Sequence, residues 1–347
     1  MRRRCLIAES TTQSCVLLTW PHPLTDWHND IDAVTAVYVE IAREISRREP
    51  LLVICYDSAH QYQAKHSLAT GGVGSDALHF FNAPTNDTWI RDYGPIAVRT
   101  GTERILLDFS FNGWGNKYPA ELDNGISQAL YAAGIFAGAN FQCQSLVLEG
   151  GSIDSDGQGT LLTTSQCLVH SGRNPGHDKQ ALEQVFRELM GIDRVLWLDH
   201  GELEGDDTDA HVDMLARFCS PQTIAYQQCT DPDDSHHTAL AAMETQLRSF
   251  RRADGEPYRL VPLPLPDPVC AATGQRLPAS YCNFLVINTA TLVPVYGEPA
   301  DAVALNRLAD CFPEREIVPI NCLALIQQFG SLHCATMQLP EGFLSLG

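Results

Sequence analysis

Residues 330–340 read GSLHCATMQLP, and Cys334 stands near the middle of this stretch. Two other short runs carry the groups that a reactive thiol needs: NDTWIRDYGP at residues 86–95 and GELEGDDTDAHVD at residues 201–213. Together the three runs hold a thiol, an imidazole and several carboxylates, without a dense set of oxyanion donors or metal ligands. This combination indicates a nucleophilic thiol that acts on a cation, and we take the fold to be organised around it.

The composition is that of a folded chain. The sequence has 347 residues, of which 44% are hydrophobic and 19% are charged, enough for one large domain or two modest ones. No segment is long enough to be a linker, and the Pro-rich residues 261–269 are expected to form a surface loop. We therefore expect a single domain over residues 1–347.

The chain is strongly acidic, since 23 Lys and Arg against 42 Asp and Glu give a formal net charge of -19. Such a field repels nucleic acids and anionic membrane surfaces and favours small cationic partners. No apolar run approaches the roughly 18 residues of a membrane span. The N-terminal MRRRCLIAES is a poor signal peptide, and the 12 cysteines form no CxxC pair. The sequence predicts a cytoplasmic protein with free thiols.

Short strands and amphipathic helices alternate along the chain. Apolar residues spaced by three and four predict a helix at residues 29–47, between buried strands at 14–20 and 51–56. The longest helix is expected at residues 235–252. Two or three strands and one helix recur about every sixty to seventy residues. A radial repeat of small sheets with helices outside would explain this pattern, and so would an open α/β sheet.

Two histidines are candidate partners of the thiol. His211 and Asp213 stand two residues apart on an expected strand at residues 211–218, so both side chains should point to one side. Such a pair can act as proton shuttle and charge partner, although a buried structural pair is the alternative. His333 precedes Cys334 on an expected strand at residues 332–337, so alternation should turn it away from the thiol.

The run at residues 86–95 offers Asp87, Trp89, Arg91 and Asp92. On a strand, the first three would share a face and Asp92 would lie on the other. The Gly-Pro pair that ends the run can break this alternation, and Asp92 could instead cap a turn.

Five motifs follow one another along the chain. They are NDTWIRDYGP at 86–95, NGWGNKYP at 112–119, LEGGSIDSDGQGTLLTT at 148–164, GDDTDAHVD at 205–213 and HCATMQ at 333–338. In this order they closely resemble the signature runs of the agmatine deiminase and bacterial peptidylarginine deiminase family, and TWPH at 19–22 matches its N-terminal run. The resemblance covers almost the whole chain. It implies a five-bladed, pseudo-symmetric α/β-propeller, the pentein fold, with the site at its centre.

Carried over by this resemblance, Cys334 is the nucleophile, His211 is the general acid and base, and Asp92 and Asp213 hold the guanidinium. A guanidinium is charged at neutral pH and presents forked N–H donors, which two carboxylates can bind from both sides. The implied reaction passes through a covalent thiouronium on the cysteine and needs neither a metal nor a cofactor. Asp87, Trp89 and Asp207 are the predicted walls for the substrate's chain and distal amine.

The departures from the family pattern bear on substrate choice more than on reaction type. Tyr93 makes the run RDYGP, as in peptidylarginine types, where agmatine deiminases typically read RDTGP. Residues 328–331 read QFGS instead of a GGGN-type run, and Ala335 and Met337 replace the usual ITQQ pattern. We expect agmatine as the substrate, with arginine and peptidylarginine as alternatives.

Other functions remain open at this point. An amidinotransferase of the same fold would pass the amidine to an amine instead of water. A polyamine- or arginine-binding protein without activity is a different class, and the four intact catalytic positions argue against it. A cysteine protease is a weak third, since no Asn or Gln stands beside the thiol in the sequence. The oligomeric state, including a homo-oligomer, is left undecided.

Overall fold

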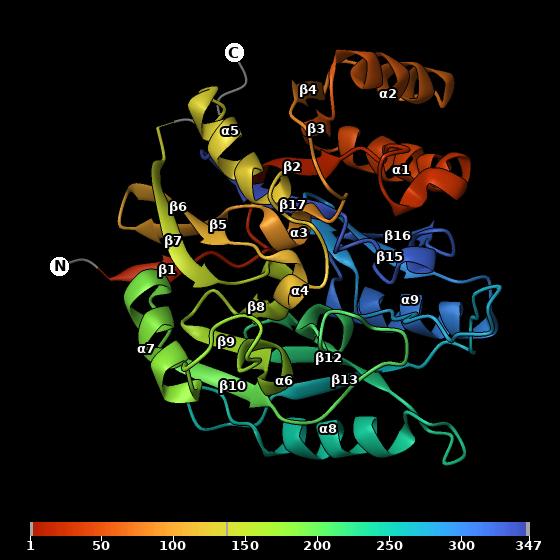
Figure 1. The fold of residues 1–347 in the computed structure, drawn as a ribbon. Coiled ribbons are helices and arrows are strands. Elements are labelled where there is room, and N and C mark those ends of the chain that lie inside the picture. Colours follow the sequence, from red (N-terminus) through yellow and green to blue (C-terminus); the bar gives the residue numbers. More distant parts are fainter. Residues whose placement is uncertain (1–2, 137, 345–347) are drawn as a thin grey trace.

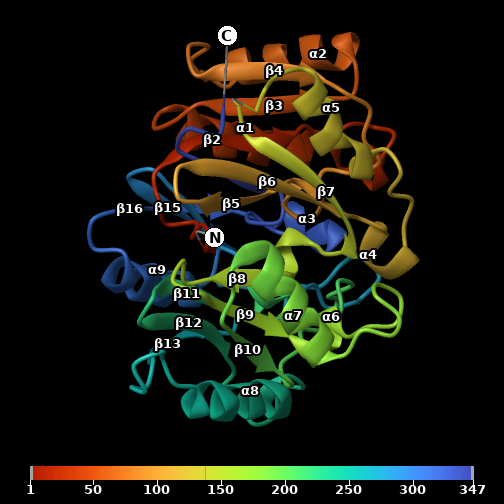
Figure 2. The same ribbon diagram turned by 90° about the vertical axis from the view of Figure 1, so that its left-hand side faces the viewer.

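The computed structural model describes residues 3–136 and 138–344. These residues form a mixed α/β fold with five small sheets of three or four strands. The longer helices α1, α2, α7, α8 and α9 lie toward the outside of the molecule, and the strands lie nearer its centre (Figure 1, Figure 2). The predicted α/β class is therefore confirmed.

Each sheet is short, and its strands come from different parts of the chain. In spatial order, the first sheet is β17 (Thr336–Pro340), β2 (Gln13–Thr19), β3 (Leu51–Cys55) and β4 (Leu78–Asn82). The second is β1 (Arg4–Leu6), β5 (Ile96–Thr100), β6 (Glu103–Ser110) and β7 (Asn140–Val147). The third is β10 (Arg194–Leu198), β9 (Thr160–Thr164) and β8 (Ile153–Ser155). The fourth is β11 (Ala216–Ser220), β12 (Thr223–Gln228) and β13 (Arg259–Pro264). The fifth is β14 (Leu285–Ile287), β15 (Ala290–Val295) and β16 (Glu316–Asn321).

The helices connect or precede these strands. The α-helices are α1 (Ile31–Ser46), α2 (Ser58–Thr70), α3 (Ile90–Tyr93), α4 (Gly113–Asn116), α5 (Ile126–Ala132), α6 (Ser165–Leu168), α7 (Lys179–Met190), α8 (His237–Ser249) and α9 (Pro299–Cys311). The described residues also form the 3-10 helices η1 (Asp26–Asn29), η2 (Asp123–Gly125), η3 (Gly150–Ser152), η4 (Val212–Met214) and η5 (Leu325–Gln328).

All five sheets contain one repeated unit. An antiparallel pair comes first, a helical connection follows, and a further strand lies parallel to the second member of the pair. In the fourth sheet, β11 and β12 are antiparallel, α8 follows, and β13 runs parallel to β12. In the first sheet the pair joins the two ends of the chain, since β17 is antiparallel to β2. Parallel neighbours require such crossovers, and the predicted recurrence of strands and one helix is confirmed.

The apolar spacing predicted α1 correctly. Val34, Tyr38, Ile41 and Ile45 are all fully buried, at the three- and four-residue intervals that place them on one face of the helix. The expected helix at residues 29–47 corresponds to Ile31–Ser46.

Two predictions about the second half of the chain are wrong. The longest helix among the described residues is α1 with 16 residues, whereas α8 has 13. The segment before α8 is a turn, because the Asp234 carboxylate accepts the backbone N–H of His236 at 2.9 Å. The Pro-rich residues 261–269 are also not all loop, since β13 extends to Pro264. It is the edge strand of its sheet, where missing N–H donors are tolerated.

Three segments predicted as strands are tight turns at the positions that matter for function. Residues 90–93 form α3, residues 212–214 form η4 ahead of β11, and β17 begins only at Thr336. Each turn leads into an antiparallel pair. None of the helices in the described residues is long and apolar enough to cross a membrane. The cysteines are free thiols.

Candidate active site

The turns that enter the five repeated units supply the side chains of one buried site. They contribute Asp92 from α3 before β5, Gly151 from η3 before β8, His211 and Asp213 at η4 before β11, Asn283 before β14, and Cys334 before β17. The four catalytic residues predicted from the sequence are all buried and come together here. Because the unit is repeated, the entering turn of each of the five units reaches the same buried site.

Gly151 marks where three of these groups converge. A Cβ atom at position 151 would lie 2.7 Å from Nδ1 of His211, 2.8 Å from Oδ1 of Asp92 and 3.0 Å from Oδ2 of Asp213. Any side chain there would displace at least one of them, so the close approach requires glycine. The Gly151 backbone N–H also donates to Oδ1 of Asp92 at 2.9 Å.

The Cys334 thiol lies beside a carboxylate and an amide. Its Sγ is 3.7 Å from Oδ2 of Asp213 and 3.3 Å from Nδ2 of Asn283. Burial raises the pKa of this thiol well above its ordinary value, and the carboxylates of Asp213 and Asp92 raise it further. In the empty site the sulfur is therefore protonated. A cation between the two carboxylates would offset their charge and favour the thiolate.

Asp92 is held by donors from two sides. Its Oδ2 accepts from the Trp114 indole N–H at 2.9 Å, and its Oδ1 lies 3.7 Å from Nδ1 of His211. Burial raises the pKa of Asp92 to about 6, although the His211 charge acts in the opposite direction. Asp92 is thus ionised at neutral pH but is protonated by mild acid.

Asp213 has one occupied oxygen and one open oxygen. Its Oδ2 lies 2.8 Å from Nδ1 of His333, while its buried Oδ1 has no hydrogen-bond partner among residues 3–136 and 138–344. Burial alone would raise the pKa of Asp213, but the hydrogen bond from His333 and nearby positive charges bring it below its ordinary value. Oδ2 is also the oxygen nearest the Cys334 sulfur, whereas the buried Oδ1 has no donor within the described residues.

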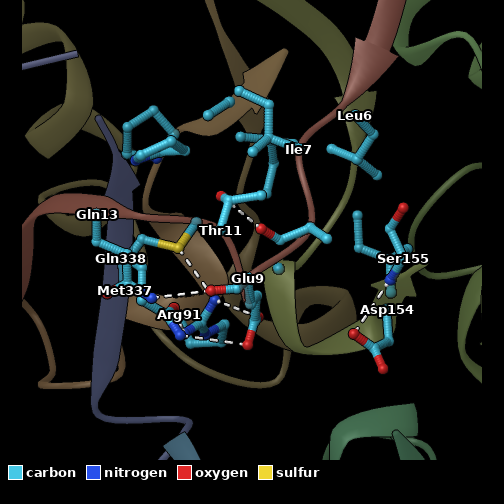
Figure 3. Close-up of a pocket in the computed structure, with 17 residues that line it drawn as sticks. Leu6, Ile7, Glu9, Thr11, Gln13, Arg91, Asp154, Ser155, Met337 and Gln338 are labelled. Atoms are coloured by element: carbon cyan, nitrogen blue, oxygen red, sulfur yellow. Dashed lines mark hydrogen bonds and ion pairs between the residues drawn. The ribbon is translucent and has the colours of Figure 1, made fainter. Parts of the chain in front are cut away.

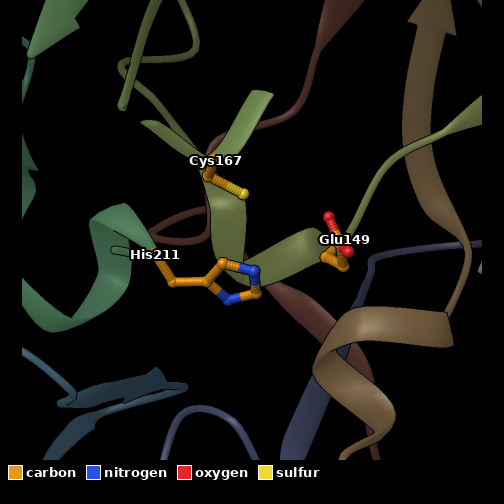
Figure 4. Close-up of side chains that lie close together, drawn as sticks. All are labelled: Glu149, Cys167 and His211. Atoms are coloured by element: carbon orange, nitrogen blue, oxygen red, sulfur yellow. The ribbon is translucent and has the colours of Figure 1, made fainter. Parts of the chain in front are cut away.

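His211 lies beside Glu149 and Cys167, which point toward its ring from two other segments (Figure 4). Burial disfavours the charged ring, yet Asp92, Cys167 and Glu149 raise the pKa of His211 well above its ordinary value. Neither ring nitrogen has a hydrogen-bond partner within the described part of the chain. The surrounding groups therefore favour the protonated ring, and both ring nitrogens are open to a ligand.

Glu149, Cys167 and His211 also have the residue types of a metal site, and their ligand atoms lie within 4.8 Å of one another. The Glu149 carboxylate is already bound by Nε of Arg173 at 2.8 and 2.9 Å, and that guanidinium is fully buried. A metal ion here would sit next to a buried positive charge, which disfavours it. The trio fits an acid and base assembly better than a metal centre.

A cavity opens onto Cys334 and Asp92. Its lining is Asp26, Asp87, Trp89, Asp92, Trp114, Tyr118, Asp207, Thr208, Gln328, Phe329, Gly330 and Cys334. Every charged residue in this lining is an aspartate. A cavity of this composition attracts a cation that also presents some apolar surface.

The three predicted substrate-binding residues all line this cavity. Burial, with Asp26 and Asp207 nearby, raises the pKa of Asp87 to about 7. Asp207 accepts from the Tyr118 hydroxyl at 2.8 Å, and burial raises its pKa. Trp89 packs so closely on the backbone at Gly330 that a Cβ there would lie 2.5 Å from its ring.

Arg91 and Tyr93 do not line the cavity. Arg91 donates to Oε1 of Glu9 at 3.0 Å and to the carbonyl of His333 at 3.3 Å. The Tyr93 hydroxyl donates to Thr19 at 2.8 Å and to the Asp87 carbonyl at 3.0 Å. Neither is placed to pair with a substrate carboxylate in the cavity.

Several residues of the site were not predicted from the sequence. Glu149 and Gly151 stand inside the quoted 148–164 motif, so the motif carried a signal that was not interpreted. Asp26 and Asn283 lie outside all five motifs. Asn283 also removes the argument that no amide stands near the thiol, since the fold brings its Nδ2 to the sulfur. Strand alternation does not apply to His333, because it precedes β17, and its Nδ1 and the Cys334 sulfur both approach Oδ2 of Asp213.

Comparisons with known proteins agree with this geometry. Residues 5–340 match the family model described as Porphyromonas-type peptidyl-arginine deiminase. The agmatine deiminase of Stutzerimonas stutzeri strain A1501 is 30% identical over 360 residues, which cover 97% of this chain and 95% of that protein.

Two solved structures are similar over nearly the whole chain. The "Putative Arginine Deiminase" of Porphyromonas gingivalis is 45% identical with a TM-score of 0.92, covering 99% of this chain and 100% of that one. A Cys-to-Ser variant of the C. jejuni agmatine deiminase, with substrate bound, is 33% identical with a TM-score of 0.90, covering 98% and 97%. The chain therefore belongs to the Porphyromonas-type peptidyl-arginine deiminase family.

Proposed function

We propose that this protein hydrolyses the guanidinium group of agmatine to give N-carbamoylputrescine and ammonia. It is a hydrolase of carbon–nitrogen bonds of the agmatine deiminase type. One observation carries the proposal: a thiol closes a cavity whose charged lining is all aspartate, beside buried groups that lack partners. Those groups are Oδ1 of Asp213 and both ring nitrogens of His211. A bound guanidinium would donate to Oδ1 of Asp213, and its departing amino nitrogen would accept the proton of one His211 ring nitrogen.

The first half of the reaction forms a covalent intermediate on Cys334. Asp92 and Asp213 hold the guanidinium, and its positive charge lowers the cost of ionising the thiol between them, so the thiol releases its proton to solvent. The thiolate attacks the guanidinium carbon to give a tetrahedral adduct. His211, which carries a proton in the empty site, donates it to one amino group, and ammonia leaves. The product is an S-alkylthiouronium on Cys334.

The second half returns the enzyme to its starting state. Neutral His211 takes a proton from water, and the resulting hydroxide attacks the thiouronium carbon. Collapse of this adduct breaks the carbon–sulfur bond. The hydroxyl proton passes to the departing sulfur, which restores the thiol and releases the neutral ureido product. Asp92 and Glu149 both favour the protonated ring, so His211 is ready to act again as an acid.

The outer part of the cavity suits an alkylammonium tail. Asp26, Asp87 and Asp207 line it together with the aromatic Trp89 and Tyr118. An aliphatic chain can pack on the rings while the terminal ammonium lies near carboxylates. We assign Asp87, Trp89 and Asp207 to this role, and Asp26 joins them.

We also infer that the five units close into a single five-bladed propeller domain. The support is that each unit has the same strand and helix order and sends its entering turn to the same site. The pairing of β17 with β2 joins the two ends of the chain in one sheet, as closure of a ring requires.

Product analysis tests the proposed function. Purified protein is incubated with agmatine, and ammonia and N-carbamoylputrescine are measured with and without an added amine. We expect both products in equal amounts without the amine. Transfer of the amidine to the amine would instead identify an amidinotransferase, and binding without turnover would identify a binding protein.

A further inference from the structure

We propose that Glu9 is a positioning residue for the reaction, acting through His333 on Asp213 and Cys334 from a cavity separate from the substrate cavity. The inference rests on the proposed deiminase function. Glu9 lies between β1 and β2 and lines a second cavity with Arg91, Met337 and Gln338 (Figure 3). This rear cavity shares no lining residue with the substrate cavity.

The Glu9 carboxylate contacts three side chains: the imidazole of His333 and the guanidinium groups of Arg91 and Arg217. Its oxygens lie 2.8 and 3.0 Å from Nε2 of His333, and it accepts from Arg91 at 3.0 Å and Arg217 at 2.6 Å. Burial opposes its ionisation, but His333 and the two arginines bring the pKa of Glu9 well below its ordinary value. A fixed negative charge is thus held against one edge of the imidazole.

The His333 ring spans two carboxylates. Its Nε2 faces Glu9 at 2.8 Å, and its Nδ1 faces Oδ2 of Asp213 at the same distance. Turning the ring over would bring carbon atoms toward both carboxylates and lose both bonds. Both bonds can form only when both ring nitrogens carry a proton. Burial and the charges of Arg217 and Arg91 lower the pKa of His333, whereas Glu9 and the bond to Asp213 raise it. Glu9 therefore holds the ring orientation and favours the protonated ring, in which an N–H is directed at Asp213.

Two consequences reach the reacting atoms. The bond from His333 occupies Oδ2 of Asp213, which leaves Oδ1 as the oxygen available to a guanidinium. His333 also precedes Cys334 directly, and its backbone N–H donates to Oδ1 of Asn283 at 2.8 Å. A shift of the ring would disturb both the carboxylate and the strand entrance that carries the thiol.

Glu9 could instead serve only as a counter-ion for Arg91 and Arg217. That role would change stability and leave the folded enzyme fully active. The two roles separate in a double-mutant cycle with His333, because a positioning effect that passes through the imidazole disappears when the imidazole is removed.

The experiment compares Glu9→Ala, His333→Asn and the double variant, with Thr11→Ala as control. Thr11 lines the same rear cavity but bonds only to the Ala8 carbonyl. We expect Glu9→Ala to lower kcat/KM for agmatine about tenfold or more, as for loss of a hydrogen bond to a charged group. In the His333→Asn background the same change should have less than about a third of that effect.

A small carboxylate provides a second readout. Formate should enter the emptied rear cavity of Glu9→Ala and raise kcat/KM in a saturable manner, whereas chloride at equal ionic strength should not. If Glu9→Ala does not fold, the same cycle is measured with Glu9→Gln. Wild-type turnover on the same substrate establishes the proposed function separately. Once that turnover is established, an unchanged kcat/KM for the Glu9 variant, or an equal loss in both backgrounds, overturns the inference.

Discussion

The indole N–H of Trp114 donates a hydrogen bond of 2.9 Å to Oδ2 of Asp92. This bond stabilises the ionised carboxylate and so lowers its pKa, which burial has raised to about 6. Trp114→Phe removes the donor and keeps an aromatic ring against Phe111 and Tyr118.

We expect Trp114→Phe to move the acidic limb of kcat/KM to higher pH. Asp92 must be ionised to hold a guanidinium, so wild-type activity should fall as the pH drops through about 6. Without the donor the same loss begins at higher pH. Tyr118→Phe is the control, because Tyr118 lines the cavity but its hydroxyl donates to Asp207. An unchanged limb in Trp114→Phe would remove Asp92 as the group that titrates.

Asp92→Asn and Asp213→Asn should both lose activity but differ in stability. Each removes one charge-assisted contact to the substrate, which costs roughly 2–5 kcal/mol in transition-state binding. The folded pKa of Asp92 is raised, so its ionised form destabilises the fold above pH 6, and Asp92→Asn should keep or raise Tm at pH 7.5. The pKa of Asp213 is lowered, so its charge contributes stability, and Asp213→Asn should lower Tm.

Kinetics and thermal unfolding of the two variants at pH 7.5 check this pair of expectations. A variant that loses Tm but keeps its kcat/KM would have a structural carboxylate rather than a substrate-binding one.

Cys334→Ala should abolish turnover while agmatine still binds, because both carboxylates remain. In the wild type, rapid acid quenching should trap a substrate-derived adduct on Cys334, which peptide mass spectrometry can locate. The exposed Cys143 provides a labelling control through Cys143→Ser, which should keep full activity. An adduct on Cys167, the thiol beside His211, would transfer the nucleophile role to that residue.

The sequence predicted which side chains lie close together better than it predicted the local backbone around them. Cys334, His211, Asp92 and Asp213 were chosen from short motifs, and the fold brings all four together. The strands assigned to their motifs were wrong because tertiary hydrogen bonds decide the backbone there. Oδ1 of Asn283 accepts a hydrogen bond from the backbone N–H of His333. The Cys334 carbonyl accepts one from the backbone N–H of Arg91 at 3.2 Å. The spacing of apolar residues along the sequence carries no information about such contacts.

Glu9 and Asn283, which act on residues far away along the chain, had no signal in any sequence pattern. Glu9 and His333 are 324 positions apart, and Asn283 lies 51 positions before Cys334. Such pairs meet only because the repeated unit returns each entering turn to one point. The repeat itself was visible in the spacing of strands and helices. The position of Asn283 in the site could have been predicted only by superposing the five units in three dimensions.

The charge of the cavity lining bears directly on substrate choice. Arginine differs from agmatine by an α-carboxylate, and the charged residues of the lining are Asp26, Asp87, Asp92 and Asp207. Arg91, the one basic residue in the 86–95 run, is bound to Glu9 on the other side. A buried carboxylate without a cationic partner costs several kcal/mol, so agmatine should exceed arginine in kcat/KM by about a hundredfold or more.

Asp207→Asn sharpens the test. It removes one carboxylate near the expected ammonium site, so it should lower kcat/KM for agmatine more than for arginine and narrow their ratio. Lys117 does not line the cavity and its ammonium is bound to Asp209 at 2.8 Å, which makes it a poor partner for the carboxylate of arginine. Steady-state kcat/KM for agmatine, arginine and a peptide with an arginine side chain decides the matter. Equal values, or a preference for either arginine compound, would refute agmatine as the substrate while leaving the deiminase chemistry of Cys334 in place.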